Sequence, residues 1–287
     1  MILTSLPDLP PRPETSANAA FRRGFYARWG RENAIVCGRA TQAEYAPFTQ
    51  TLSLKTAWGG SERYFLRRRE VAVDADNFLV LNEGSTYASL LAARRPAWTF
   101  CVFFRPGMQH EVRGALAQTA EQTLTQPDAA QRSAEFSEHL RPHDPALTEQ
   151  LRHLRDQVLA GERCEDWLEE QLLLMLGTML VLEDADHHAA LARIAATRAS
   201  TRHELLRRLR LAADFIQSQH RQTMTLADMA GVACLSRYHF VRLFRQLFGS
   251  TPHAYLTHKR AQAARHLMES GETDRRLPKL AEGDTVQ

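Results

Sequence analysis

The sequence has few of the features that mark secreted or membrane-spanning proteins. Its 287 residues include only four cysteines: Cys37, Cys101, Cys164 and Cys234. No two of them form a C-x-x-C pair, so we expect reduced thiols in a reducing compartment rather than a disulfide framework. Residues 1–24 lack a basic start followed by a long apolar run, and the most apolar stretch, 172–182, is too short to cross a bilayer. We therefore expect a cytoplasmic protein without a membrane partner.

The sequence also lacks the motifs of common enzyme classes, since it has no nucleophile motif, phosphate-binding loop or solenoid repeat. Pro106-Gly107-x-x-His110 resembles part of a cupin metal motif, so a metal-dependent cupin enzyme is a rival interpretation. A metal site needs further ligands nearby, and no His-x-His or His-plus-Glu pair precedes His110. His187-His188 lies in a polar stretch and is interpreted as solvated. We expect no catalytic residue, no metal and no cofactor.

Charge is unevenly distributed along the chain. Residues 200–268 contain 11 Lys and Arg but only 3 Asp and Glu, a net charge of +8, together with six histidines. Residues 1–199 contain 22 basic and 25 acidic residues, a net charge of −3. A compact basic block suits a polyanion, nucleic acid first, although a solvated basic face explains the charge equally well.

The first part of the chain has the pattern of a small β domain. Residues 1–20 are rich in Pro, Ser and Ala and predict a poorly ordered arm. Short apolar runs at 35–37, 78–81 and 99–104 predict strands, and Gly59-Gly60-Ser61 predicts a turn. Several short strands with Gly and Pro between them favour a barrel or sandwich over residues 21–115.

Residues 146–182 change to a helical period. Apolar residues at 147, 151, 154 and 158 share one helix face, and Ala160-Gly161 ends the pattern. A second helix is predicted over 164–182, with Trp167, Leu168, Met175 and Met179 on its apolar face. This hairpin either packs on the core or forms a dimer interface, and both interpretations stay open. Residues 183–200 are predicted to be a linker.

The last third predicts a helix-turn-helix. A helix is expected over 201–219, followed by a short helix over 226–233 with a Thr225-x-x-Asp228 capping box. After a turn at Cys234-Leu235, where glycine is common, Ser236 is a suitable N-cap for a helix that ends near residue 248. Gly249 stops this helix, and Pro252 suits the next one, over 253–269.

The third helix of this segment is the predicted DNA reader. Met229, Ala230, Ala233, Leu235, Phe240 and Leu243 fill the core positions of a helix-turn-helix. The outward face is left with the candidate DNA-binding residues, which are Ser236, Arg237, Tyr238, Val241, Arg242 and Arg245. Arginines can pair with guanine or reach phosphates, Tyr238 and Val241 can touch sugars or thymine methyls, and the helix N-terminus favours a phosphate.

Residues 205–268 resemble the arabinose-regulator (AraC/XylS) family of bacterial transcription factors. The resemblance is carried by Leu226-Ala-Asp-Met-Ala230, Leu235-Ser236, His239-Phe240, Arg242-Leu243-Phe244-Arg245, Gly249-Ser-Thr-Pro252, Tyr255-Leu256, Arg260 and Ala264 to Leu267. It implies that the helix after Ser236 enters the major groove and that Phe240, Phe244, Pro252 and Tyr255 are packing residues. His239 is expected to be half-buried packing rather than a base reader. The resemblance further implies a cupin-like barrel that senses a small effector, and a hairpin that pairs protomers.

The end of the chain departs from the family pattern. The family has two helix-turn-helix units, and residues 270–287 hold only the start of a second one, at Leu277, Leu280 and Ala281. A single unit makes few phosphate contacts, and dimerisation through residues 146–182 can restore binding by presenting two units to two half-sites. An alternative is a regulatory partner that dimerises but no longer binds DNA specifically.

Together these patterns predict an α+β protein. A cupin-like β-barrel with a helical hairpin is expected over 21–182, and an all-α helix-turn-helix domain over 201–287. The expected partners are double-stranded DNA, a small-molecule effector and a second copy of the chain, with RNA polymerase as a further candidate.

Overall fold

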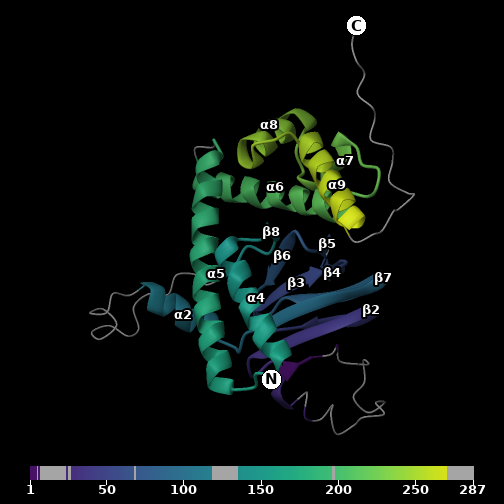
Figure 1. The fold of residues 1–287 in the computed structure, drawn as a ribbon. Coiled ribbons are helices and arrows are strands. Elements are labelled where there is room, and N and C mark those ends of the chain that lie inside the picture. Colours follow the sequence, from purple (N-terminus) through teal and green to yellow (C-terminus); the bar gives the residue numbers. More distant parts are fainter. Residues whose placement is uncertain are drawn as a thin grey trace. The chain divides into compact units, whose positions relative to one another are not determined.

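A computed structural model describes residues 1–4, 6, 24, 27–67, 69–117, 135–195 and 198–269. The chain divides into two compact units, Met1–Arg193 and Ile194–Gln287. The first unit combines a β-sheet with helices, and the second is helical in its described part (Figure 1). The predicted α+β class, with a β domain before a helical domain, is therefore confirmed. The expected start of a second helix-turn-helix unit, at residues 277–281, lies outside the described residues.

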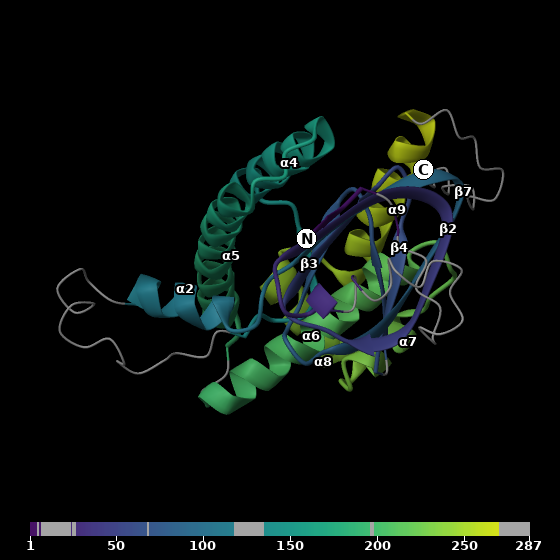
Figure 2. The same ribbon diagram turned by 90° about the horizontal axis from the view of Figure 1, so that it is seen from below.

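One eight-stranded sheet builds the first unit. Its strands are β1 (Ile2–Leu3), β2 (Ala34–Thr49), β3 (Ser53–Trp58), β4 (Glu62–Leu66), β5 (Arg69–Val73), β6 (Asn77–Leu81), β7 (Thr86–Phe103) and β8 (Leu140–Pro142). The two long strands β2 and β7 pair with each other, while the other edge of β7 pairs first with β4 and then with β3. Seen in Figure 2, β2 and β7 curve so that the sheet encloses an interior.

The predicted strands are present, but β2 and β7 are longer than the apolar runs suggested. The second half of β2 and the centre of β7 carry the exposed residues of these strands. Pro47 of β2 lies at a register shift between Tyr45 and Phe48. Such a bulge keeps a proline within a strand without breaking the pairing. Gly38 also lies within β2, and a Cβ there would come 2.6 Å from the Leu6 side chain. The first residues of the predicted arm are not disordered, since β1 pairs with β2, and residues 7–20 lie outside the described residues.

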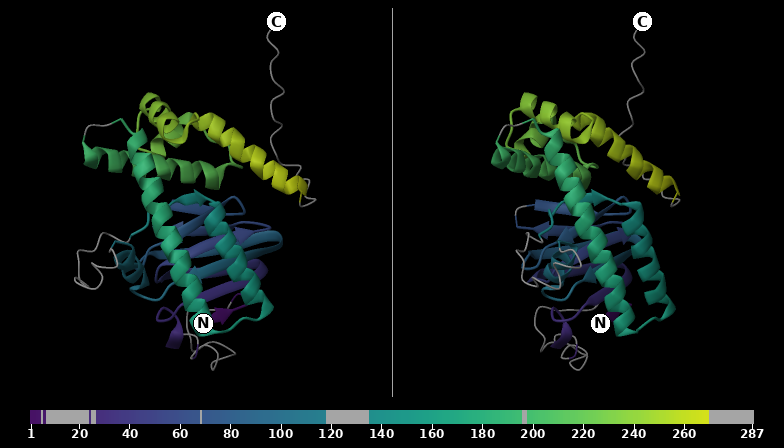
Figure 3. Two further views of the ribbon diagram at one scale, coloured as in Figure 1. Left: turned by 60° about the vertical axis from the view of Figure 1, so that its left-hand side comes forward. Right: turned by 90° about the vertical axis from the view of Figure 1, so that its left-hand side faces the viewer.

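Helices α4 (Pro145–Ala160) and α5 (Glu165–Arg193) cross one face of the sheet, and α2 (Met108–Ala117), which was not predicted, packs against α5 (Figure 3). The expected apolar stripe of α4, Leu147 to Val158, is buried together with Leu168, Met175 and Met179 of α5. Gly161 ends α4 with a φ of 102°. The hairpin therefore packs on the sheet, as one of the two interpretations expected. No helix in the described ranges is long and apolar enough to cross a membrane.

The prediction of a linker over 183–200 was wrong for residues 183–193, which continue α5. The physical reason is that the acidic residues there have partners in the first unit. Glu183 is buried and pairs with Arg141 of β8, while the Asp184 carboxylate lies 2.5 Å from the Arg113 guanidinium of α2. The charges that suggested a solvated segment are instead held by two arginines.

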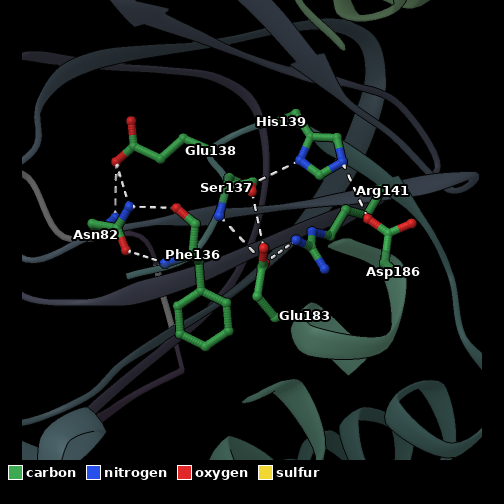
Figure 4. Close-up of polar contacts among 8 residues, drawn as sticks. All are labelled: Asn82, Phe136, Ser137, Glu138, His139, Arg141, Glu183 and Asp186. Atoms are coloured by element: carbon green, nitrogen blue, oxygen red, sulfur yellow. Dashed lines mark hydrogen bonds and ion pairs between the residues drawn. The ribbon is translucent and has the colours of Figure 1, made fainter. Parts of the chain in front are cut away.

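The segment before β8 joins the sheet to α5 through a polar network (Figure 4). Asn82, just after β6, makes a reciprocal pair of hydrogen bonds with the backbone of Phe136, both 2.8 Å long. The Ser137 hydroxyl donates to Glu183 at 2.9 Å, and His139 lies 3.9 Å from Asp186. Residues 136–141 therefore hold the end of β6 and the last turns of α5 together.

Candidate DNA interface

The second unit contains the predicted helices at nearly the predicted positions. They are α6 (Ala199–Gln219), α7 (Leu226–Val232), α8 (Arg237–Phe248) and α9 (Pro252–Glu269). Helix α6 contacts α7, α8 and α9, so it is the helix on which the others pack. Its buried face includes the predicted Leu209, Ala212, Ala213 and Ile216.

Local capping explains where α7 and α8 begin. The Thr225 hydroxyl accepts from the Asp228 backbone N–H, and the Asp228 carboxylate accepts from the Thr225 N–H at 2.7 Å, which is the predicted capping box. These hydrogen bonds lower the pKa of Asp228 below its usual value. Ser236 caps α8, as predicted, by accepting from the His239 N–H. Gly249 ends α8 with a φ of 76°.

The turn between α7 and α8 contains Cys234 at the position where helix-turn-helix proteins commonly have glycine, as the sequence indicated. Cys234 has a φ of 50°, in the left-handed region where glycine is favoured. Its backbone carbonyl accepts a hydrogen bond from Arg208 of α6 at 3.3 Å. The turn therefore keeps the left-handed geometry that a glycine would adopt, at the cost of some strain.

Helix α8 has one apolar face and one basic face. Phe240, Leu243, Phe244 and Leu247 are buried, and the Phe240 and Phe244 rings meet edge to face with centroids 5.3 Å apart. Tyr255 of α9 packs edge to face on Phe244 at 5.5 Å, which confirms its predicted packing position. Because these contacts fix the rotation of α8, they also fix which side chains face outward.

The predicted DNA-binding residues lie together on that outward face. Arg237, Tyr238, Arg242 and Arg245 are exposed, Tyr238 by 74%, and Val241 is half-buried. An open groove on this face is lined by Tyr238, Val241, Arg242, Arg245, Gln246 and Thr251. Gln246 and Thr251 were not predicted. Gln246 follows Arg242 by one helical turn, and this i+4 spacing is a signal that could have identified it.

At the start of α8, His239 differs from its prediction, whereas Ser236 has the predicted capping role. His239 is exposed rather than half-buried, because its ring lies over the helix N-terminus, where Nδ1 is 3.0 Å from the Ser236 hydroxyl. Ser236 is exposed but uses its oxygen as the cap. Its side chain therefore positions the start of the helix, and a helix N-terminus in general favours an anion.

The basic residues of this unit fall into two groups. Arg260 donates to the carbonyls of His220 and Gln222 at 2.8 and 2.9 Å, so it fastens α9 to the end of α6. Arg207 and Arg208 hydrogen-bond to Glu204 and lower its pKa to about 2. By contrast, none of the salt bridges among the described residues involves Arg237, Arg242 or Arg245. The positive charge of the outward face of α8 therefore remains available to an anion.

The rival metal site is not assembled in the described part of the chain. His110 is exposed on α2, and the described residues contain no group of three His, Cys, Asp or Glu side chains that could hold a metal ion. The segment 106–110 starts a helix instead, since Gly107 accepts from the His110 N–H at 3.0 Å.

Comparison with known proteins agrees with this geometry. Residues 216–257, from the end of α6 to the start of α9, match the family described as bacterial regulatory helix-turn-helix proteins, AraC family. No curated protein matches the chain.

Solved structures show more distant likenesses. ToxT from Vibrio cholerae is similar with a TM-score of 0.37 and 9% identity, over 85% of this chain and 86% of ToxT. The AraC-like transcriptional activator CuxR has a TM-score of 0.36 and 12% identity, over 83% of this chain and 78% of CuxR. A cupin-2 domain protein from Shewanella frigidimarina covers 28% of this chain and 89% of its own, at 11% identity and a TM-score of 0.21.

The match to the family coincides with the described helices, caps and basic face. It includes the capping box, the α7–α8 turn, the buried face of α8 and the packing of Tyr255. The chain therefore carries a DNA-binding helix-turn-helix of the AraC family of bacterial transcription regulators.

Proposed function

We propose that the protein is a cytoplasmic, sequence-specific transcription regulator. It would bind DNA by placing α8 in the major groove. The observation that carries this proposal is the outward face of α8, where three unpaired arginines surround Tyr238 and Val241 on a helix fixed by an apolar core. Arginine guanidinium groups match the acceptors of guanine, and a tyrosine or valine can contact a thymine methyl.

We assign distinct roles to the residues of this face. Arg242 and Val241, near the middle of α8, are proposed to reach base edges, with Tyr238 one turn before Arg242. Arg237 and Arg245, nearer the helix ends, are proposed to contact phosphates and position the helix. The backbone at Ser236 adds a phosphate contact at the helix N-terminus.

We also propose that the first unit makes the regulator responsive to an effector and pairs two copies of the chain. Leu174 and Val181 of α5 are 57% and 56% exposed, and they lie two helical turns apart on one face. Such a pair supports a helix-to-helix contact between protomers, which would present two α8 helices to two half-sites. Sedimentation analysis of Leu174→Glu checks this, because the charge should shift a dimer to a monomer.

In vitro selection of the full chain on a pool of random duplexes tests the proposed DNA reading. An enriched motif is expected, and Arg242→Ala should weaken binding to it by about 1–3 kcal/mol, or roughly 5- to 150-fold. Arg152→Ala, which removes an exposed arginine from α4, is the matched control and should leave the affinity unchanged. A pool without enrichment would contradict the proposal and favour a partner that dimerises without reading DNA.

A further inference from the structure

Gln246 carries the only amide side chain of helix α8, all of whose residues the structure describes. It is exposed, and it lines the groove on the outward face together with Tyr238, Val241, Arg242 and Arg245. It follows Arg242 by four residues, which places both side chains on one side of the helix. A partner that enters this groove therefore comes within reach of the amide as well as of the arginines.

The Gln246 amide is not used by the described part of the chain. No hydrogen bond joins it to another described residue. Helix α8 has no acidic residue that could compete for it, and the residues one turn away are Arg242, Leu243, Gly249 and Ser250. An exposed polar side chain of this kind contributes little to stability. Its donor and acceptor are therefore available to a group outside the chain.

An amide recognises a different base from the arginines around it. A guanidinium group only donates hydrogen bonds, and this matches the O6 and N7 acceptors of guanine. The glutamine amide has a carbonyl oxygen that accepts and an NH₂ group that donates, which matches the N6 amino group and the N7 atom of adenine in the major groove. A phosphate oxygen only accepts, so it would leave the amide carbonyl unused. Adenine therefore suits Gln246 better than a phosphate does.

We propose that Gln246 is a further specificity-determining residue of α8, which reads an adenine through hydrogen bonds to its N6 and N7 atoms. The inference rests on the proposed function, because it requires α8 in the major groove. Four helical residues span about 6 Å, and base pairs are stacked about 3.4 Å apart. The adenine is therefore expected about two base pairs from the one that Arg242 contacts, on the side away from Tyr238.

Selection from random duplexes, repeated with variants of the full chain, tests this assignment. Gln246→Glu keeps the size of the side chain but leaves only acceptors, so the preference at that position should change from adenine to cytosine, whose N4 amino group donates. Gln246→Ala should remove the preference there and leave the rest of the motif unchanged. Gln222→Ala, which removes an exposed glutamine outside α8, is the matched control and should leave the whole motif unchanged.

Modified duplexes test the two hydrogen bonds separately. Replacing the adenine by 7-deazaadenine removes the N7 acceptor, and replacing it by unsubstituted purine removes the N6 amino group. Each should weaken binding of the native chain by about 2- to 10-fold, and a different base pair should weaken it by roughly 5- to 150-fold. Gln246→Ala should bind the modified and unmodified duplexes equally, so it corrects for changes in the duplex itself.

Two results would overturn the inference while the DNA-reading role stands. One is an enriched motif whose base preferences are the same for the native chain, Gln246→Glu and Gln246→Ala, since the amide would then be solvated or on a phosphate. The other is an equal loss of affinity for the modified duplexes in the native chain and in Gln246→Ala. Failure of the native chain to enrich any motif would instead refute the proposed function, and the inference with it.

Discussion

The interior of the sheet and helix α8 place their polar groups in opposite ways. Helix α8 buries only apolar side chains and exposes its arginines, so its chemistry is available to a large partner without any buried charge. The sheet buries Lys55, Glu62 and the hydroxyls of Ser53 and Tyr87 among apolar side chains. The difference separates a helix surface whose charge is open to a large anion, as proposed above, from an interior whose charged groups are enclosed by the chain itself.

Removing a buried apolar side chain of α8 should have the largest effect on the free energy of unfolding. Phe240 is fully buried, and Phe240→Ala should lower the free energy of unfolding by about 3–5 kcal/mol, because it leaves a cavity between α8 and its neighbours. Urea unfolding followed by circular dichroism measures this. Tyr238→Ala, on the exposed face, should change stability by less than about 0.5 kcal/mol. Equal losses of unfolding free energy in the two variants would contradict the distinction between the buried and exposed faces of α8.

The next prediction concerns the free energy of unfolding contributed by the buried ion pair between Glu183 and Arg141 in the first unit. Glu183→Ala leaves the Arg141 guanidinium buried without its carboxylate, and we expect a loss of about 3 kcal/mol in the free energy of unfolding. Replacing both partners, as Glu183→Leu with Arg141→Met, should recover most of that loss, since no charge is then left unpaired. A double variant less stable than Glu183→Ala would show that the ion pair does not account for the effect.

Lys55→Met should instead raise stability at neutral pH. The pKa of Lys55 is about 8 in the folded chain and 10.5 in the unfolded one, so the unfolded state binds more protons between these values. The stability of the native chain relative to Lys55→Met should therefore rise from pH 8 toward 9, by up to about 1.4 kcal/mol per pH unit. Cys101 titrates oppositely above pH 9, so urea unfolding at pH 7, 8 and 9 is the useful series. A difference independent of pH would contradict a buried, charged Lys55.

The smallest expected effect is at the start of α7. Thr225→Ala removes the hydroxyl that caps the helix and should cost about 1 kcal/mol of unfolding free energy. Thr223→Ala, at an exposed residue just before the cap, is the control and should be close to neutral. Comparable losses in both variants would show that the capping box does not stabilise this unit.

The helix-turn-helix could be predicted from sequence because its signals are local. Thr225, Ser236 and Gly249 each mark a helix boundary through hydrogen bonds or a left-handed φ within a few residues. The rotation of α8 followed from its apolar period. His239 was misjudged because its ring bonds to the Ser236 hydroxyl instead of entering the core.

The first unit was less predictable because its decisive contacts are distant in sequence. The pairing of Lys55 with Cys101, and the contact of its ammonium with Phe103, depend on a register between strands about fifty residues apart. Likewise, the extension of α5 through Glu183 depends on Arg141, which the local polar composition does not reveal. Strand patterns indicated the class of domain but not which polar groups it buries.

The most direct test of the central claim is a titration of the full chain against a selected duplex and a scrambled duplex of the same composition, at two salt concentrations. A protein that reads DNA through α8 should bind the selected duplex at least about 10³-fold more tightly, with both affinities falling as salt rises. Equal affinities for the two duplexes at both salt concentrations would contradict sequence reading by α8.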